Sequence, residues 1–335
     1  MRKVFIMAEV GQAHEGSLGI LHSYIDALST TGVDAIKFQT HIAEAESSIY
    51  ESFRFKFSYE DKTRFDYWKR MEFSLEQWKD LKKHCDDVGL EFVSSPFSNM
   101  AVDWLEEIGV EKYKIGSGEV SNFLMLEKIA KTGKDIILSS GMSSFSELDE
   151  TIKFLKKFDN KVSILQCTTM YPTNAKNIGL NVIRELKDRY NLLVGFSDHS
   201  GTIYPSLSAI SLGAEIIEFH AVFDKLMYGP DSESSITIKE IDQLVQGARF
   251  IETSMNNNID KTDNSKFAEL KNIFEKTLAV NKDMKMGDII AFEDLEAKKP
   301  SGQGISAKEH MRVIGKKLNK NKNKWDFLKK SDTND

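Results

Sequence analysis

The chain has few of the features that mark secreted, membrane-spanning or nucleic-acid-binding proteins. It contains two cysteines in 335 residues, too few for a disulfide framework and typical of a reducing cytoplasm. Its Met-Arg-Lys start leads into a short apolar run that ends at Glu9, unlike a secretory signal, and no run approaches the roughly 20 apolar residues of a membrane helix. The net charge of −6 argues against nucleic acid as the main partner. We therefore expect a cytoplasmic globular protein that binds neither membrane nor nucleic acid.

What the chain does have is a series of short apolar runs, each followed by a polar or ionisable residue. The runs cover residues 4–8, 35–38, 92–93, 113–115, 136–138, 162–165, 192–196 and 216–219. An amphipathic helical stretch lies between successive runs. Eight such β/α units predict an α/β fold, the (β/α)8 TIM barrel, with an active site at the carboxyl ends of its strands.

Composition divides the chain into parts. Residues 1–255 suit the barrel, 256–272 form a polar linker, 273–320 form a small strand-rich module, and 321–335 read as a polar tail. Residues 40–73 form a long loop rich in aromatic and charged residues, which predicts a partly helical lid that also contacts a partner. Ser74 begins a capping-box pattern that predicts the start of the next helix.

Two histidines provide the strongest chemical signal. His199 and His220 close the seventh and eighth predicted strands, so both should lie on the same rim of the barrel. Two imidazoles with open positions for water and substrate suit a divalent transition metal. The alternative is a hydrogen-bonded rim histidine beside an unrelated core histidine.

Lysines and serines at other strand ends point to an anionic ligand. Lys37 and Lys114 end the second and fourth predicted strands, where a phosphate or carboxylate would satisfy their charge. Hydroxyls suited to phosphate oxygens follow at the same level, from Ser95, Ser117, Ser139 and Ser197. The alternative is a structural network in which the lysines pair with Glu9 and Glu119.

Three carboxylates, those of Glu9, Glu119 and Asp231, are placed to hold sugar hydroxyls or to move protons. Cys167 has no base partner in its local sequence, so we expect it to pack rather than to act as a nucleophile. His14 lies in a glycine-flanked loop, from which it could line the site.

Together these residues resemble the sialic acid synthase family, whose members make nine-carbon nonulosonic acids. The resemblance covers residues 3–318, and its motifs are AEVGQAHEGSL (8–18), KFQTHIAEAESS (37–48), FVSSPFS (92–98), YKIGSGE (113–119), ILSSGM (137–142), CTTMYPT (167–173), GFSDHSG (195–201), EFH (218–220) and GPDS (229–232). Residues 278–304 resemble the antifreeze-like (SAF) domain that such synthases carry.

The resemblance implies a metal-dependent condensation of phosphoenolpyruvate with an N-acylated amino sugar, N-acetylmannosamine first, in a domain-swapped homodimer. The cofactor would be a divalent ion, manganese first and magnesium or cobalt otherwise, held by His199 and His220. The resemblance assigns phosphoenolpyruvate binding to Lys37, Ser95, Lys114, Ser117, Ser139 and Ser197, and Thr169 takes the place of an asparagine that often contacts phosphoenolpyruvate in the family. It assigns the sugar to Glu9, Gln39, Glu119, Tyr171 and Asp231, and the N-acyl group to Lys299. Among these, Glu119, Glu9 and His220 are the expected catalytic residues, with Glu119 helping to hold or open the sugar ring.

The chain departs from the family pattern at two of these positions. Thr169 stands where members often have an asparagine, and Lys299 stands where they have the arginine that holds the N-acyl group. The alternative sugar is a 2,4-diacetamido-trideoxyhexose, which would give legionaminic or pseudaminic acid. Two alternatives of other classes are a non-catalytic carbohydrate-binding protein and an aldolase with a Schiff-base lysine.

Overall fold

The computed structural model describes residues 3–333. The chain folds into two compact units, Met1–Asn257 and Asn258–Asp335. The division falls within the stretch expected as the linker. Within the described residues, no helix is both long and apolar enough to cross a membrane.

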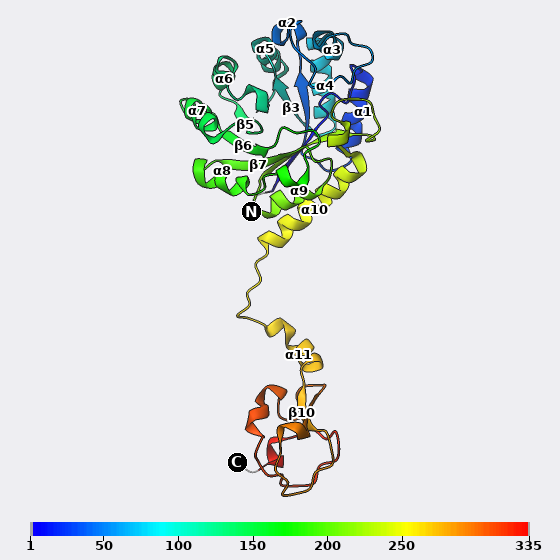
Figure 1. Cartoon of the computed structure of the whole chain (residues 1–335), viewed down its shortest axis with the longest axis vertical. Helices are drawn as coiled ribbons and strands as arrows, with labels where there is room; N and C mark the ends of the chain where they lie inside the picture. The colour runs from blue at the N-terminus through cyan, green and yellow to red at the C-terminus, as the bar shows by residue number, and fades with distance from the viewer. Residues whose placement is uncertain (1–2, 334–335) are drawn as a thin grey trace. The chain divides into compact units, whose positions relative to one another are not determined.

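The first unit is a closed barrel of parallel strands surrounded by helices (Figure 1). Each strand pairs with the next along the chain, and β1 also pairs with β8, which closes the ring. The strands are β1 (Phe5–Glu9), β2 (Ala35–Thr40), β3 (Glu91–Pro96), β4 (Lys112–Ile115), β5 (Asp135–Ser139), β6 (Val162–Cys167), β7 (Leu193–Asp198) and β8 (Ile216–Val222), and the two-residue β9 (Ile236–Thr237) is added beside β8. They correspond to the eight apolar runs, and the predicted TIM barrel is confirmed.

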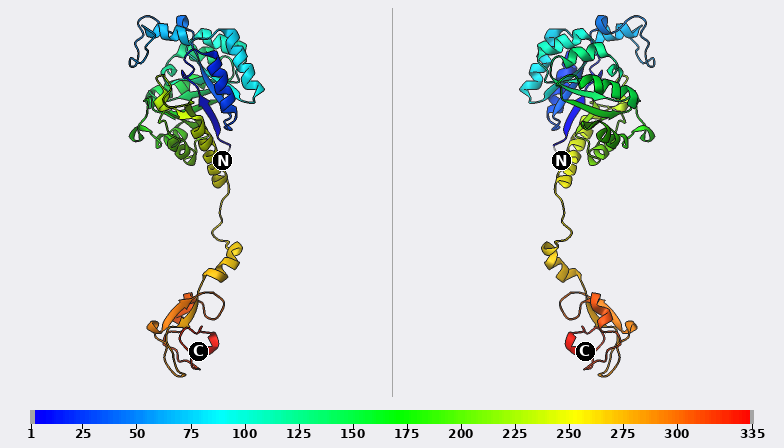
Figure 2. Two further views of the ribbon diagram at one scale, coloured as in Figure 1. Left: turned by 90° about the vertical axis from the view of Figure 1, so that its right-hand side faces the viewer. Right: turned by 90° about the vertical axis from the view of Figure 1, so that its left-hand side faces the viewer.

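Among the described residues, seven of the ten helices of the first unit begin at a residue whose side chain caps the helix. The Ser74 hydroxyl accepts from the Gln77 amide in a capping box, as predicted. The helices are α1 (Leu18–Ser29), α2 (Ala43–Glu46), α3 (Arg64–Met71), α4 (Leu75–Asp87), α5 (Asn99–Ile108), α6 (Phe123–Ala130), α7 (Phe145–Leu155), α8 (Val182–Tyr190), α9 (Tyr204–Ser211) and α10 (Ile238–Asn256). The start of β1 lies beside α10 in both views of Figure 2, and Arg249 of α10 donates to the Val4 carbonyl.

The barrel interior changes from apolar to polar along the strands. Its apolar layer is Met7, Ala35, Val93, Ile137, Leu165 and Ile216, all buried. Side chains two residues apart on a strand face the same side. The next inward positions are therefore Glu9, Lys37, Ser95, Ser139, Cys167 and Glu218. The two-residue period of the strands thus places a polar layer above the apolar layer. This polar layer forms the floor of the cavity described below.

The long segment between β2 and α4 is partly helical, as predicted, because it contains α2 and α3. Its aromatic residues form their own small core, in which Tyr67, Trp68 and Met71 of α3 are buried against Phe53 and Phe57. Arg70 binds this segment to the loop after β1. Its guanidinium pairs with Asp61 at 2.9 Å and with Glu15 at 3.0 Å.

The second unit contains α11 (Ala268–Phe274) and an antiparallel pair, β10 (Thr277–Val280) and β11 (Leu295–Lys298). The prediction of a polar tail over 321–335 is wrong for residues 321–333. Leu328 is fully buried in this unit's core, and Phe327 forms a bridge with Ala279. Asp332 is buried and pairs with Lys322 and Lys320. Apolar residues at wide spacing among lysines hide this role in the sequence, and residues 334–335 lie outside the described chain. The antifreeze-like identity of the unit stays a prediction.

Candidate active site

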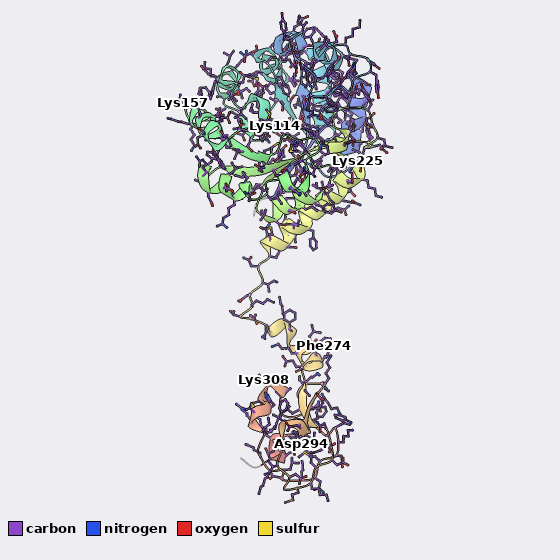
Figure 3. The ribbon with its side chains drawn as sticks, in the orientation of Figure 1. Lys114, Lys157, Lys225, Phe274, Asp294 and Lys308 are labelled. Atoms are coloured by element: carbon purple, nitrogen blue, oxygen red, sulfur yellow. The ribbon has the colours of Figure 1, made fainter. Side chains whose placement is uncertain are left out.

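A cavity of about 550 Å³ opens at the carboxyl ends of the barrel strands. It is lined by every residue of the first unit for which the sequence predicted a catalytic, substrate-binding or metal-binding role. These are Glu9, Lys37, Gln39, Ser95, Lys114, Ser117, Glu119, Ser139, Thr169, Tyr171, Ser197, His199, His220 and Asp231. Figure 3 labels Lys114 in the middle of the barrel. Lys299 belongs to the second unit, where its ammonium nitrogen lies 4.8 Å from the centroid of the Phe274 ring.

Glu9 links three neighbouring strands at the floor of the cavity. The strand register places it opposite Lys37 on β2 and His220 on β8. Its carboxylate accepts hydrogen bonds from Lys37 and from Gln39 Nε2, the latter at 2.7 Å, and its Oε2 lies 3.3 Å from His220 Nε2. Burial alone would raise the pKa of Glu9, but the charges of Lys37 and His220 outweigh it and hold that pKa well below its usual range. Glu9 is therefore an ionised acceptor.

Lys114 pairs with a carboxylate that the sequence reasoning did not single out. Its Nζ lies 3.2 Å from Oε1 of Glu218, and Ser197 Oγ donates to the same oxygen at 3.4 Å. The sequence left open a structural network in which the lysines pair with Glu9 and Glu119. This prediction is correct for Lys37, which pairs with Glu9, and wrong for Lys114, which pairs with Glu218. The sequence feature that could have identified Glu218 is its position two residues before His220 on the same strand, which makes both side chains point to the interior of the barrel.

Several polar atoms of this floor lack a protein partner. The hydroxyls of Ser139 and Thr169 and Oε2 of Glu218 are buried without a hydrogen bond to any residue from 3 to 333. Buried polar atoms of folded proteins are almost always hydrogen-bonded. The unpartnered hydroxyls, next to two buried lysines, therefore suit a ligand with anionic oxygens.

Gly141 packs directly against these hydroxyls. A Cβ at this position would clash with Oγ1 of Thr169 and Oγ of Ser117 and would lie 3.0 Å from Cys167 Sγ. The Gly141 amide donates to Ser117 Oγ at 3.1 Å. Only glycine lets this backbone approach the site so closely.

The two rim histidines are neighbours, with ring centroids 5.3 Å apart. His199 Nδ1 lies 3.0 Å from the Thr168 carbonyl, which can only accept, so this nitrogen is protonated and Nε2 is the nitrogen that loses its proton when the ring becomes neutral. Within residues 3–333, no group of three or more His, Cys, Asp or Glu side chains is arranged to hold a metal ion. The donors that these residues offer a metal ion are the two neighbouring imidazoles, and a metal held by them would take its remaining ligands from substrate and water.

The protonation of the two histidines differs. Burial lowers the pKa of His220 and outweighs the charge of Glu9, which favours the neutral imidazole that binds metals. Burial would also lower the pKa of His199, but Cys167 and the Thr168 carbonyl outweigh it and raise the pKa to about 9. Binding of a metal ion at His199 must therefore release a proton.

Glu119 lies on the opposite side of the cavity mouth, at the end of a short 3-10 turn (Ser117–Glu119) after β4. Asn122 Nδ2 donates to its Oε2 at 2.7 Å. Burial raises the pKa of Glu119 and outweighs this hydrogen bond, and the charge of Glu46 raises it further. A carboxyl group whose pKa is raised towards neutrality is suited to exchange protons with a sugar hydroxyl.

Arg54, in the segment between β2 and α4, is a cavity residue that the sequence reasoning missed. Its guanidinium lies over the Tyr171 ring, 4.3 Å from the centroid, and pairs with Asp231 at 3.2 Å. His41 also lines the cavity, stacked between Trp68 and Phe97 with centroid distances of 4.0 and 4.5 Å. The sequence feature that could have identified Arg54 is its position as a cationic residue between Phe53 and Phe55 in an unusually long loop.

Two minor expectations are corrected. His14 is not among the described residues that line the cavity, and burial lowers its pKa to about 3, as for a packing histidine. Cys167 does have a histidine partner, because its Sγ lies 3.8 Å from His199 Nδ1. Burial alone would raise the pKa of the Cys167 thiol, but the charge of His199 outweighs it and lowers that pKa.

Comparison with known proteins relates the whole chain to one group of enzymes. The model of the NeuB family matches residues 24–260. The chain is 36% identical over 327 residues to N,N'-diacetyllegionaminic acid synthase of Campylobacter jejuni, with 96% of this chain and 97% of that protein covered. It is 30% identical to human N-acetylneuraminate-9-phosphate synthase, with coverages of 94% and 88%. The crystal structure of N-acetylneuraminic acid (sialic acid) synthetase from Leptospira borgpetersenii, in complex with citrate, matches with a TM-score of 0.71 and 32% identity, covering 80% of this chain and 90% of that chain.

Proposed function

Since the chain belongs to the NeuB family, we propose that it condenses phosphoenolpyruvate with an N-acylated amino sugar to a nine-carbon nonulosonic acid and phosphate. The observation that carries this proposal is the polar floor of the barrel. Two buried lysines and two unpartnered hydroxyls share one cavity there. Phosphoenolpyruvate carries a phosphate and a carboxylate, which such donors bind through charge-assisted hydrogen bonds.

In this reaction C3 of phosphoenolpyruvate attacks the aldehyde carbon of the open-chain sugar, water adds at C2, and phosphate leaves by C–O cleavage. Lys37 and Lys114 hold the phosphate and carboxylate oxygens and offset the charge that moves between them. Ser139 and Thr169 orient the same oxygens with their free hydroxyls. Glu119, with its raised pKa, takes a proton from the sugar hydroxyl as the ring opens.

A divalent ion belongs to this proposal as cofactor, manganese first. His199 and His220 would hold it, and when bound it acts as a Lewis acid on the sugar's aldehyde oxygen. Glu9 keeps the His220 ring in place and remains an ionised acceptor for the sugar. EDTA should therefore abolish phosphate release, and manganese should restore it.

The sugar itself has two candidates. N-acetylmannosamine is the first candidate, as the resemblance of the sequence to the sialic acid synthase family implies. The relative at 36% identity is a diacetyllegionaminic acid synthase, which favours a 2,4-diacetamido-trideoxyhexose equally. A difference of one acyl group or hydroxyl between such sugars is discriminated by a few contacts at the cavity mouth. Arg54, Tyr171 and Asp231 are placed to make those contacts.

The alternatives of other classes have less support. A degenerate, carbohydrate-binding barrel has no reason to keep two histidines, two lysines and their carboxylates around one cavity. An aldolase that forms a Schiff base needs a free amine. Lys37 and Lys114 are instead engaged in ion pairs with the buried carboxylates of Glu9 and Glu218.

The deciding experiment incubates the purified protein with phosphoenolpyruvate, manganese and a panel of N-acylated hexoses, and measures phosphate release. We expect release with one sugar class and dependence on both substrates. Borohydride trapping with pyruvate is the control, because the proposed route forms no imine. No release with any sugar, or a trapped adduct on a lysine, would contradict the proposal.

We also propose that the chain forms a homodimer in which the second unit of one subunit covers the barrel of its partner. Two full-length variants test this, His220→Ala in the barrel and Lys299→Glu in the second unit. Each variant alone should be inactive. Mixing them should restore turnover, because in a swapped heterodimer the intact second unit of the His220→Ala chain covers the intact barrel of the Lys299→Glu chain. No rescue in a demonstrated heterodimer would contradict swapping.

A further inference from the structure

Two histidines on the outside of the barrel form a second cluster, away from the cavity. His22 lies on α1 and His84 on α4, and their Nδ1 atoms face each other at 2.8 Å. The ring centroids are 5.0 Å apart. Both side chains are partly exposed, by 30% and 23%. Neither histidine lines the catalytic cavity.

The outer nitrogen of each ring faces a carboxylate from the opposite helix. His84 Nε2 lies 3.0 Å from Asp26 Oδ1, and His22 Nε2 lies 3.7 Å from Asp80 Oδ2. The four residues are two pairs spaced by four, His22 with Asp26 on α1 and Asp80 with His84 on α4. Residues four apart share one face of a helix, so the two pairs meet crosswise.

The carboxylates favour one tautomer of each ring. A carboxylate only accepts, so it favours the tautomer in which Nε2 is protonated and Nδ1 bears the lone pair. With both rings neutral and in this tautomer, two lone pairs would face each other at 2.8 Å, which is repulsive. A cation between them removes this repulsion. Carboxylates that orient the outer N–H of metal-ligating histidines are the usual second layer of such sites.

From this geometry we propose a zinc-type transition-metal site formed by Nδ1 of His22 and Nδ1 of His84, with water in the remaining positions. Imidazole pairs suit zinc, copper and nickel. Tetrahedral zinc with bonds of about 2.0–2.1 Å separates two nitrogens by about 3.4 Å, so the rings need to part by only ~0.6 Å. The ion joins α1 to α4 on the barrel surface and stabilises the folded state by binding it selectively.

The test measures zinc binding by full-length protein that has been stripped with EDTA and desalted. The histidines of the catalytic cavity are present in every variant, so their zinc cancels in the comparison. We expect His22→Asn and His84→Asn each to lose one bound zinc per chain, or to weaken that binding more than tenfold. They should also lose the zinc-dependent part of the rise in melting temperature. The matched control is His310→Asn in the second unit, which should bind zinc as the parent does.

A second variant keeps both imidazoles. Asp26→Asn removes the carboxylate that orients His84, and we expect several-fold weaker zinc binding with an unchanged fold by circular dichroism. Phosphate release should not change in any of these variants, because the cluster lies outside the cavity. Equal zinc stoichiometry and affinity in the parent, His22→Asn and His84→Asn would overturn the proposal. Binding at millimolar zinc only would do the same, because it would mean that a proton rather than a metal joins the two rings.

Discussion

The Nζ of Lys114 lies 3.2 Å from Oε1 of Glu218, and both side chains are almost completely buried. Lys37 and Glu9 form a second buried pair beside them. The floor of the cavity therefore holds two positive and two negative groups that balance one another. Breaking either pair leaves an uncompensated buried charge, which is strongly destabilising.

Lys114→Met should raise the KM for phosphoenolpyruvate roughly 10- to 100-fold, because a charged hydrogen bond worth about 1.5–3 kcal/mol is lost. It should also lower the free energy of unfolding, since Glu218 loses its partner. The double variant Lys114→Met, Glu218→Gln should recover stability but not phosphoenolpyruvate binding. Steady-state kinetics and urea unfolding measure both effects. A change confined to the sugar's KM would show that the lysine serves the other substrate.

Arg54→Met should raise the sugar's KM by about tenfold while leaving the KM for phosphoenolpyruvate within about twofold. The guanidinium positions Tyr171 and Asp231, and its removal frees both. One charged hydrogen bond accounts for this magnitude. Arg54→Lys is the matched control, because it keeps the charge but loses the planar contact with the Tyr171 ring. Its KM for the sugar should lie between those of the parent and of Arg54→Met. Equal effects on both substrates would argue for a general role in closing the cavity.

Asn122→Asp should move the acid limb of the pH profile of kcat/KM to higher pH. The pKa of Glu119 is already raised, so its ionised, proton-accepting form is lost at a higher pH than for an ordinary glutamate. The substitution removes the donor to Oε2 and adds a negative charge, and both raise this pKa further. The Asn122 side chain also caps α6 through the Met125 amide, a role that aspartate retains. An unmoved acid limb would exclude Glu119 as the base.

Gly141→Ala should lower kcat/KM for phosphoenolpyruvate by about 100-fold or more, because the new methyl group displaces the hydroxyls of Thr169 and Ser117. The measurement is phosphate release at saturating sugar. Gly19→Ala is the matched control: this glycine lies in α1 away from the cavity, and alanine there should stabilise the helix slightly. Near-normal activity in Gly141→Ala would mean that these hydroxyls do not contact substrate.

Asp34→Asn should destabilise the barrel at neutral pH but not in acid. Asp34 accepts from the Ile6 amide and from Arg249, each at 2.9 Å. Burial alone would raise its pKa, but Lys3, the Ile6 amide and Arg249 outweigh it and lower that pKa below the ordinary 3.8. The stabilisation is therefore complete above about pH 5 and is lost as pH falls through the folded-state pKa. Urea unfolding should show a deficit of about 1.5–3 kcal/mol at pH 7 that shrinks below pH 4. A deficit independent of pH would contradict this.

Much of the barrel and its floor followed from local patterns in the sequence. An apolar run that ends in a polar residue is sufficient to place Glu9, Lys37 and Ser139, because a parallel barrel brings strand ends together. The pairing of Lys114 with Glu218 could not be predicted, since it depends on side chains of strands far apart in sequence. Arg54 was missed because a loop has no periodicity. Residues 321–333 were misread because their few buried side chains are separated by lysines.

The pairing of β1 with β8 makes the site depend on the order of folding. These strands come from opposite ends of the barrel sequence, so their contact carries the largest loop-closure cost in the unit. Glu9 and His220 approach to 3.3 Å only when the ring closes. A partly folded barrel can form the β2–β7 ladder and most of its helices and still lack the central carboxylate–histidine contact. Acquisition of catalytic activity during refolding should therefore follow the recovery of helical circular dichroism.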